Sequence, residues 1–251
     1  MELTKINIDP SGFPESIIPY LTDCDIYDSS CHSEAKVYYS SKGYFIKTAP
    51  KGTLFTEAEN AKAFYEKGVG VKVIRYVSEE KDYLVTQKAV GEDLTHFKGS
   101  VEEICEIIID SMSQIHAYEE VNVGISFAMK HYDSFEPKNE NADITEFTNL
   151  LGVTSAEKAR EIIIKNRGIL RCESLIHGDM CLPNIIRADD GKITFIDLGY
   201  AGMGDKNIDV YWAAWTLWYN IGLDAAELFL EKYTGYSSSA VSYIAACEAL
   251  S

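Results

Sequence analysis

The most informative part of the sequence is HGDMCLPN at residues 177–184, followed by FIDLG at residues 195–199. Together they place Asp179, Asn184 and Asp197 close to one another in the sequence. Transfer of a phosphoryl group needs a carboxylate beside the attacking hydroxyl, oxygen ligands for Mg²⁺, and cations near the phosphates. Asp179 is therefore the candidate catalytic residue, and Asn184 and Asp197 are the candidate metal ligands.

The spacing of these residues is informative by itself. In protein kinases the catalytic Asp precedes a metal-binding Asn by five positions, and an Asp-x-Gly after a strand supplies the other metal ligand. Asp179 and Asn184 have this spacing, and Asp197 follows a short β-rich segment at 193–196. A chance match of five residues at set offsets, which here are His177, Asp179, Asn184, Asp197 and Gly199, has odds on the order of one in ten thousand if all residue types are equally frequent. The pattern predicts a kinase-like site.

Upstream of this stretch, the first third of the chain favours a small antiparallel sheet with one helix. Residues 37–39 and 44–46 are rich in β-formers and flank a turn at 40–43, which is typical of a hairpin. Good helix formers at 53–66 end at Gly68 and Gly70. Further strands are predicted at 71–77 and 83–86.

After residue 91 the pattern becomes helical. Two capping boxes are predicted in front of apolar residues at helical spacing. One pairs Ser100 with Glu103, and the other pairs Thr154 with Glu157. Two more helices are predicted at 208–221 and 225–233, with Asp205 and Asp209 as candidate caps of the first. The polar segment 130–143 has no clear period, so we expect a loop or the approach to a helix there.

The net charge indicates which classes of partner to expect, and the cysteines indicate the cellular compartment. Subtracting 39 acidic from 23 basic residues gives a net charge of −16, which disfavours nucleic acid and anionic membranes and suits a cationic ligand. The six cysteines are scattered without a C-x-x-C pair, as expected of reduced thiols in a cytoplasmic protein. No export signal or membrane span is predicted. We expect a monomer or a weak homodimer.

Residues 177–185 and the segment 195–209 resemble the aminoglycoside phosphotransferase family, in particular the 3′-phosphotransferases. The resemblance covers nearly the whole chain and is tight from about residue 175 to 209. It implies an α+β, protein-kinase-like bilobal fold. The lobes would be an antiparallel-sheet lobe at 1–86, a hinge at 87–92 and a helical lobe at 93–251, with ATP, or GTP in its place, and Mg²⁺ bound between them.

The same resemblance implies roles upstream. Ser33 matches a serine that contacts phosphate, Lys47 matches the lysine that holds the α- and β-phosphates, and Glu59 is the expected helix partner of Lys47. Glu57 competes with Glu59 for that role. The hinge residues expected beside adenine are Gln87, Lys88, Ala89 and Val90.

For the acceptor, the resemblance implies an aminoglycoside phosphorylated on its 3′-hydroxyl beside Asp179, and antibiotic resistance as the result. Glu248 and the C-terminal Ser251 resemble the acidic tail that binds substrate amines. The family pattern breaks at Trp215 and Tyr219, which stand where the family presents charged side chains. Tyr219 is therefore a candidate acceptor contact.

Three alternatives remain open at this point. The aromatic residues at 215 and 219 also suit a kinase of another small hydroxylated metabolite or antibiotic. A non-catalytic nucleotide-binding module is disfavoured by the complete set of Lys47, Asp179, Asn184 and Asp197. A protein kinase is disfavoured because the chain lacks a G-x-G-x-x-G loop and an Ala-Pro-Glu segment. A metal-ligand role for His177 is disfavoured, since no second His or Cys lies at ligand spacing. The family resemblance implies that His177 braces the catalytic loop.

Overall fold

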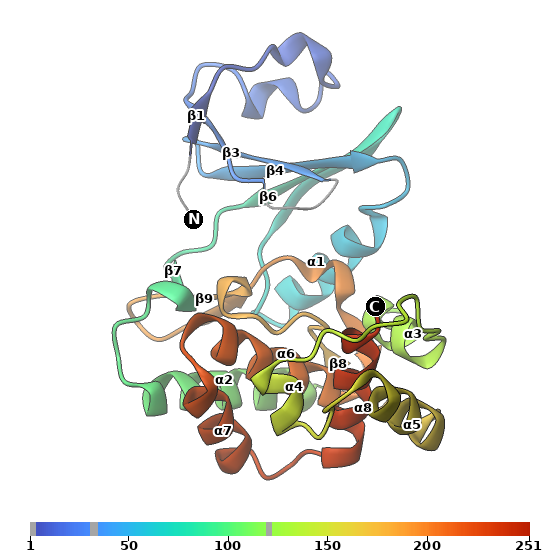
Figure 1. The fold of residues 1–251 in the computed structure, drawn as a ribbon. Helices are drawn as coiled ribbons and strands as arrows, with labels where there is room; N and C mark the ends of the chain where they lie inside the picture. Colours follow the sequence, from blue (N-terminus) through green and yellow to red (C-terminus); the bar gives the residue numbers. More distant parts are fainter. Residues whose placement is uncertain (1–3, 31–34, 119–121) are drawn as a thin grey trace. The chain divides into compact units, whose positions relative to one another are not determined.

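The computed structural model describes residues 4–30, 35–118 and 122–251 (Figure 1). The chain divides into two compact units. The first contains Met1–Val90 with Thr194–Gly199, and the second contains Gly91–Ile193 with Tyr200–Ser251. The fold is α+β, as predicted. The predicted domain bounds remain a prediction: lobes at 1–86 and 93–251 and a hinge at 87–92. In the structure, Thr194–Gly199 group with the first unit.

A six-stranded sheet forms most of the first unit, in the order β1-β2-β3-β4-β6-β5. Every neighbouring pair is antiparallel. The strands are β1 (Thr4–Ile6), β2 (Ile26–Asp28), β3 (Lys36–Ser40), β4 (Tyr44–Pro50), β5 (Val73–Ser78) and β6 (Lys81–Gln87), and the unit also holds helix α1 (Phe55–Glu66) and the 3-10 turns η1 (Pro10–Gly12) and η2 (Ile18–Tyr20).

The two faces of this sheet pack against different partners because side chains alternate along a strand. Tyr83 and Val85 of β6 join a cluster with Ile17 and Ile46, while the intervening Leu84 belongs to a second cluster that includes Ala58 of α1. Helix α1 therefore covers only one face of the sheet. That face is where the phosphate-binding lysine is expected.

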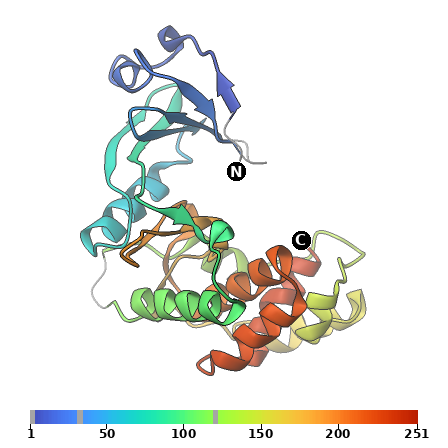
Figure 2. The same ribbon diagram turned by 90° about the vertical axis from the view of Figure 1, so that its left-hand side faces the viewer.

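Helices form most of the second unit (Figures 1 and 2). They are α2 (Val101–His116), α3 (Phe127–Asp133), α4 (Glu146–Leu150), α5 (Ala156–Asn166), α6 (Lys206–Asn220), α7 (Leu223–Lys232) and α8 (Ser238–Ala249), with the 3-10 turns η3 (Leu94–His96) and η4 (Leu182–Asn184). The short strands are β7 (Glu92–Asp93), β8 (Ser174–Ile176), β9 (Ile185–Arg187) and β11 (Gly202–Gly204). Strand β7 pairs with β9, and β8 pairs with β11, both antiparallel.

The chain passes between the units at three points, first from Val90 to Gly91. Strand β10 (Ile193–Phe195) leads from the second unit into the first, and η5 (Leu198–Tyr200) leads back. Across the part of the chain that the structure describes, no helix is both long and apolar enough to span a membrane.

Most predicted elements are confirmed, including the hairpin of β3 and β4, helix α1, and the capping box of Ser100 and Glu103. One predicted cap is wrong by one residue. Ser155, not Thr154, accepts the hydrogen bond at the start of α5, from Lys158 N at 3.0 Å. The predicted loop at 130–143 begins within α3, and α8 was not predicted, since its many small side chains give a weak apolar period.

Candidate active site

Lys47 projects from β4 toward helix α1. In the register of the sheet Lys47 lies opposite Leu84, whose side chain packs in the cluster that contains Ala58 of α1. Cross-strand neighbours share a face, so Lys47 lies on the face of the sheet that α1 covers. The alternation of the strand thus directs an ammonium group toward the helix.

Two carboxylates hold this ammonium group. Lys47 Nζ lies 2.8 Å from Glu57 Oε2 and 2.8 Å from Asp197 Oδ1. Burial by itself would lower the pKa of Lys47, but the charges of Glu57 and Asp197 outweigh burial and hold the pKa above its usual value. Lys47 is therefore a permanent cation at neutral pH, as a group that binds phosphates must be.

The structure corrects the predicted partner of Lys47 from Glu59 to Glu57. The side chain of Glu59 is 50% exposed and pairs with Lys62, whereas that of Glu57 is 11% exposed. Helical periodicity explains the difference. Glu57 shares the buried face of α1 with Ala61 and Phe64, at i+4 and i+7, and Glu59 is rotated by about 200° from it. The apolar period of α1 could have distinguished the two glutamates.

Replacement of Glu57 and of Glu59 by Gln tests this correction. We expect Glu57→Gln to lower kcat/KM for ATP roughly 10- to 100-fold, because the loss of a charged hydrogen bond of about 1.5–3 kcal/mol releases Lys47 from its position. Glu59→Gln, the matched control on the same helix, should leave steady-state kinetics within about twofold. Equal effects of the two substitutions would contradict the assignment.

The segment that carries Asp197 is fixed to the same helix within the first unit. Asn60 Nδ2 donates to Leu198 O at 3.0 Å, and the Phe195 ring meets the Phe64 ring edge to face, with centroids 6.2 Å apart. Asp197 itself has a φ of +56°, in the left-handed region that few residues other than Gly adopt. This conformation, held by packing on both sides, is the kind of strain that accompanies functional positions.

In the second unit, Asp179 lies on a loop that restrains its carboxylate from two sides. Asn184 Nδ2 donates to Asp179 Oδ2 at 2.9 Å, and Cys181 Sγ donates to Oδ1 at 3.1 Å. Burial raises the pKa of the Cys181 thiol well above its usual value, as does the nearby Asp179, so this thiol remains a donor. The loop presents a carboxylate of defined orientation.

A fully buried carboxylate, Asp209 of α6, holds the backbone of this loop. It accepts hydrogen bonds from His177 N at 3.0 Å, Gly178 N at 2.7 Å and His116 Nε2 at 2.9 Å. Asp205 caps α6 as predicted, but Asp209 braces the loop and does not act as a cap. His177 is buried too, with Nδ1 accepting from Asp179 N at 3.3 Å.

Gly178 is required by space as well as by conformation. Its φ is +80°, and a Cβ at this position would lie 2.3 Å from the carbonyl oxygen of Tyr200. Only glycine allows the chain to pass Tyr200 and turn toward Asp179. The Gly of the HGD motif is thus explained by geometry.

The predicted metal ligands fit Mg²⁺ in their donor chemistry. Asn184 Nδ2 donates to both Asp179 O and Asp179 Oδ2, at 3.0 and 2.9 Å, which leaves the amide oxygen of Asn184 directed elsewhere. Asp197 uses Oδ1 for Lys47, and its side chain is half exposed. An amide oxygen such as that of Asn184 and a carboxylate such as that of Asp197 are each a donor that Mg²⁺ accepts, and Mg²⁺ binds through one or two protein oxygens together with substrate phosphates.

The hinge residues lie at the end of the sheet. Gln87 N donates to Lys72 O and Lys88 N donates to Gly43 O, both at 2.9 Å, and the Lys88 ammonium lies 5.2 Å from the centroid of Tyr39. Ala89 and Val90 follow β6, and Val90 is 78% exposed. Ser33 lies outside the described residues.

The predicted acceptor residues have different environments. Tyr219 is 68% exposed on α6. Glu248 is mostly buried, and one of its oxygens accepts from the Tyr132 hydroxyl at 2.8 Å; burial raises the pKa of Glu248. Ser251 Oγ donates to Cys247 O at 3.0 Å, and the Ser251 carbonyl oxygen accepts from the Asn139 side chain. The tail is therefore tied to the segment that follows α3.

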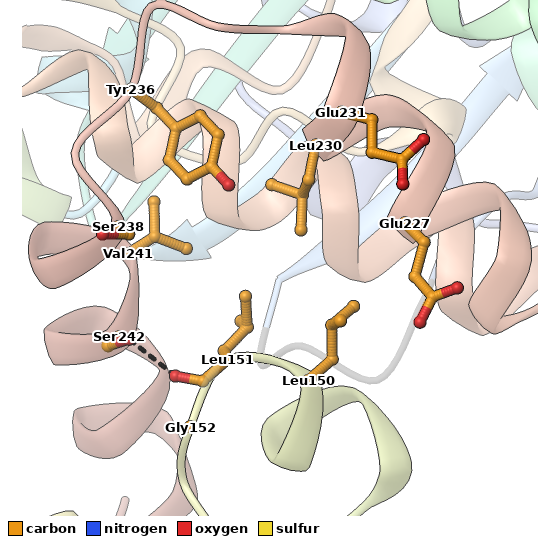
Figure 3. A pocket seen from close by; sticks show the side chains of 10 residues that line it. All are labelled: Leu150, Leu151, Gly152, Glu227, Leu230, Glu231, Tyr236, Ser238, Val241 and Ser242. Atoms are coloured by element: carbon orange, nitrogen blue, oxygen red, sulfur yellow. Dashed lines mark hydrogen bonds between the residues drawn. The ribbon is translucent and has the colours of Figure 1, made fainter.

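A separate cavity of about 630 Å³ lies among α4, α7 and α8 (Figure 3). Leu151, Leu230 and Val241 form its apolar part, while Glu227 and Glu231 lie on its rim. Ser242 Oγ donates to Leu151 O at 2.6 Å beside it. The residues that line this cavity include none of the predicted catalytic, nucleotide or metal residues.

Known proteins resemble this chain in sequence and in fold. The chain is 36% identical over 243 residues to a protein of Lactococcus lactis named "Probable aminoglycoside 3'-phosphotransferase", covering 92% of this chain and 91% of the relative. Among solved structures, an aminoglycoside-3'-phosphotransferase of type VIII superposes with a TM-score of 0.65 at 15% identity, covering 99% of this chain and 94% of the other. An aminoglycoside phosphotransferase of Streptomyces rimosus, solved with ADP and streptomycin, superposes with a TM-score of 0.59 at 19% identity, covering 86% and 90%.

A protein-family model also matches most of this chain. The model described as "Phosphotransferase enzyme family" matches residues 33–240, which include Lys47, Asp179, Asn184 and Asp197. The chain belongs to this family and is a small-molecule phosphotransferase, related to the aminoglycoside phosphotransferases.

Proposed function

We propose that the protein transfers the γ-phosphoryl group of ATP to the 3′-hydroxyl of an aminoglycoside, and that this modification confers resistance to the antibiotic. The observation that carries the proposal is the restrained carboxylate of Asp179, held by Asn184 and Cys181 in a loop braced by Asp209. The name of the relative at 36% identity and the net charge of −16 support a polycationic acceptor.

In this mechanism Asp179 accepts the proton of the acceptor hydroxyl. The hydroxyl oxygen then forms a bond to the γ-phosphorus, and the bond between that phosphorus and the β,γ-bridging oxygen breaks to release ADP. Lys47, held by Glu57, neutralises the α- and β-phosphates. Adenine is contacted by the predicted hinge residues Gln87, Lys88, Ala89 and Val90. A phosphate is contacted by Ser33.

Asn184 and Asp197 would hold Mg²⁺ through an amide and a carboxylate oxygen. When bound, the ion offsets the negative charge that develops on the transferred phosphoryl group. Glu248, through the oxygen that does not accept from Tyr132, and Ser251 bind acceptor amines, and Tyr219 contacts the acceptor.

A panel of acceptors tests the proposal. We expect ADP release to be stimulated by kanamycin, which has a free 3′-hydroxyl, and not by tobramycin, which lacks it, because that hydroxyl is the nucleophile. KM for kanamycin should rise with ionic strength, since screening weakens long-range attraction between the acidic protein and the antibiotic. If only an alcohol that is not an aminoglycoside stimulated ADP release, the aminoglycoside would be refuted as the acceptor, while the assignment as a kinase would stand.

A further inference from the structure

Three aromatic side chains form a row along α6. Trp212, Trp215 and Tyr219 follow one another at i, i+3 and i+7, so they lie on one face of the helix. The rings of Trp215 and Tyr219 are nearly parallel, at 11° with centroids 5.0 Å apart, and Trp212 meets Trp215 edge on at 73° and 5.5 Å. Tyr219 is exposed and both tryptophans are half buried. We call these three residues the aromatic row.

The aromatic row lies beside the point where the catalytic loop contacts α6. Thr216, which neighbours Trp212 and Tyr219 on the helix surface, accepts a hydrogen bond from Leu182 N at 3.2 Å. Leu182 is three residues from Asp179 in the same loop. A molecule that contacts the aromatic row therefore lies near the loop that carries the catalytic carboxylate.

Two carboxylates lie near α6, the helix that carries the aromatic row. A carboxylate oxygen of Glu146 accepts a hydrogen bond from Trp218 Nε1 at 2.9 Å, and Trp218 lies about one helical turn after Trp215. Glu248 accepts from the Tyr132 hydroxyl at 2.8 Å, and burial together with the charge of Glu248 raises the pKa of Tyr211, the residue before Trp212 on α6. Aromatic faces and nearby carboxylates both attract a cation, and neither favours an anion.

We propose that the aromatic row is the part of the acceptor site that binds an ammonium-bearing ring of the substrate through cation–π contacts. This inference rests on the proposed function and specifies its acceptor site. Half-buried indoles with carboxylates nearby attract a protonated amine on a compact carbon framework, and Tyr219, which stacks on Trp215, is 68% exposed to solvent. The amine recognised at this position is thus held by aromatic faces.

A graded series at one position separates cation–π binding from apolar packing. Trp215→Phe keeps an aromatic face with a weaker attraction for cations, and Trp215→Leu keeps only apolar bulk. We expect KM for kanamycin to increase in the order Trp, Phe, Leu, reaching roughly 2- to 30-fold for Leu, with kcat changed less than KM. Tyr65→Leu, at an exposed aromatic residue on α1, is the control and should leave both constants unchanged.

Calorimetric binding of kanamycin in the presence of MgADP, with the neutral sugar trehalose as a second ligand, distinguishes failure of this inference from failure of the proposed function. The inference requires that kanamycin binds the wild type, binds Trp215→Leu more weakly, and that trehalose binds neither. Wild-type affinity and KM in Trp215→Leu would overturn it while leaving the phosphotransfer assignment intact. Binding that depends on Trp215 without phosphorylation of any aminoglycoside would overturn the function and retain the inference, and no binding at all would overturn both.

Discussion

Replacement of Asp179 by Asn is expected to lower kcat by roughly 10²–10⁴ while nucleotide binding survives, because general base catalysis acts in the transition state. Asparagine has nearly the same shape and keeps one oxygen that can accept from Asn184 or Cys181. The loop, braced independently by Asp209, should therefore keep its conformation. What is lost is the group that accepts the proton of the acceptor hydroxyl.

The measurement is single-turnover ADP formation with saturating ATP and acceptor, together with ADP affinity from calorimetry. Asp189→Asn, at an exposed carboxylate that makes no part of the proposed site, is the control and should behave as wild type. Wild-type turnover in Asp179→Asn would refute the assignment of the base. A parallel loss of ADP affinity would indicate instead that the substitution disturbs the fold.

Replacement of Asp197 is expected to lower turnover by roughly 10³-fold or more, since a metal ligand contributes several kcal/mol to the stabilisation of developing charge. Asp197→Asn is the informative variant because Asn adopts the left-handed region readily, as the φ of +56° requires. Asp197→Ala adds backbone strain of about 1–2 kcal/mol to the loss of the ligand. Both variants also remove one of the two negative charges beside Lys47.

Turnover measured across a titration of Mg²⁺ tests this prediction. We expect no recovery in Asp197→Asn at ordinary excess of Mg²⁺, because the missing ligand and the altered charge beside Lys47 are not supplied by the solvent. Thermal unfolding separates the two variants, with a lower melting temperature for Ala than for Asn. Undiminished Mg²⁺-dependent turnover in Asp197→Asn would show that another residue holds the metal.

The catalytic constellation could be predicted because its information is local. The five-residue interval from Asp179 to Asn184 and the Asp-Leu-Gly after a β segment are the spacing of a kinase-like site, so residue type and spacing suffice to predict it. The hairpin of β3 and β4 and the capping box of Ser100 depend on neighbours within a few residues, and both are present. A local pattern in sequence produces a local structure.

Other features depend on side-chain direction. The choice between Glu57 and Glu59 follows from which side of α1 packs on the sheet, a consequence of period 3.6 that a family resemblance does not carry. The conformation of Asp197 at positive φ is likewise not evident from the letters FIDLG, since Asp adopts it only when the surrounding structure holds it there.

By itself, then, the sequence determined the α+β class, and it predicts the chemistry of the site and a cationic partner. Only the tertiary structure decided that Asp209 braces the catalytic loop together with His116, 93 residues away, and that Glu248 turns inward to Tyr132, 116 residues away. The physical reason is that a buried polar group must find its hydrogen-bond partners wherever packing brings them. Segments far apart in the chain supply those partners, so no local pattern records them.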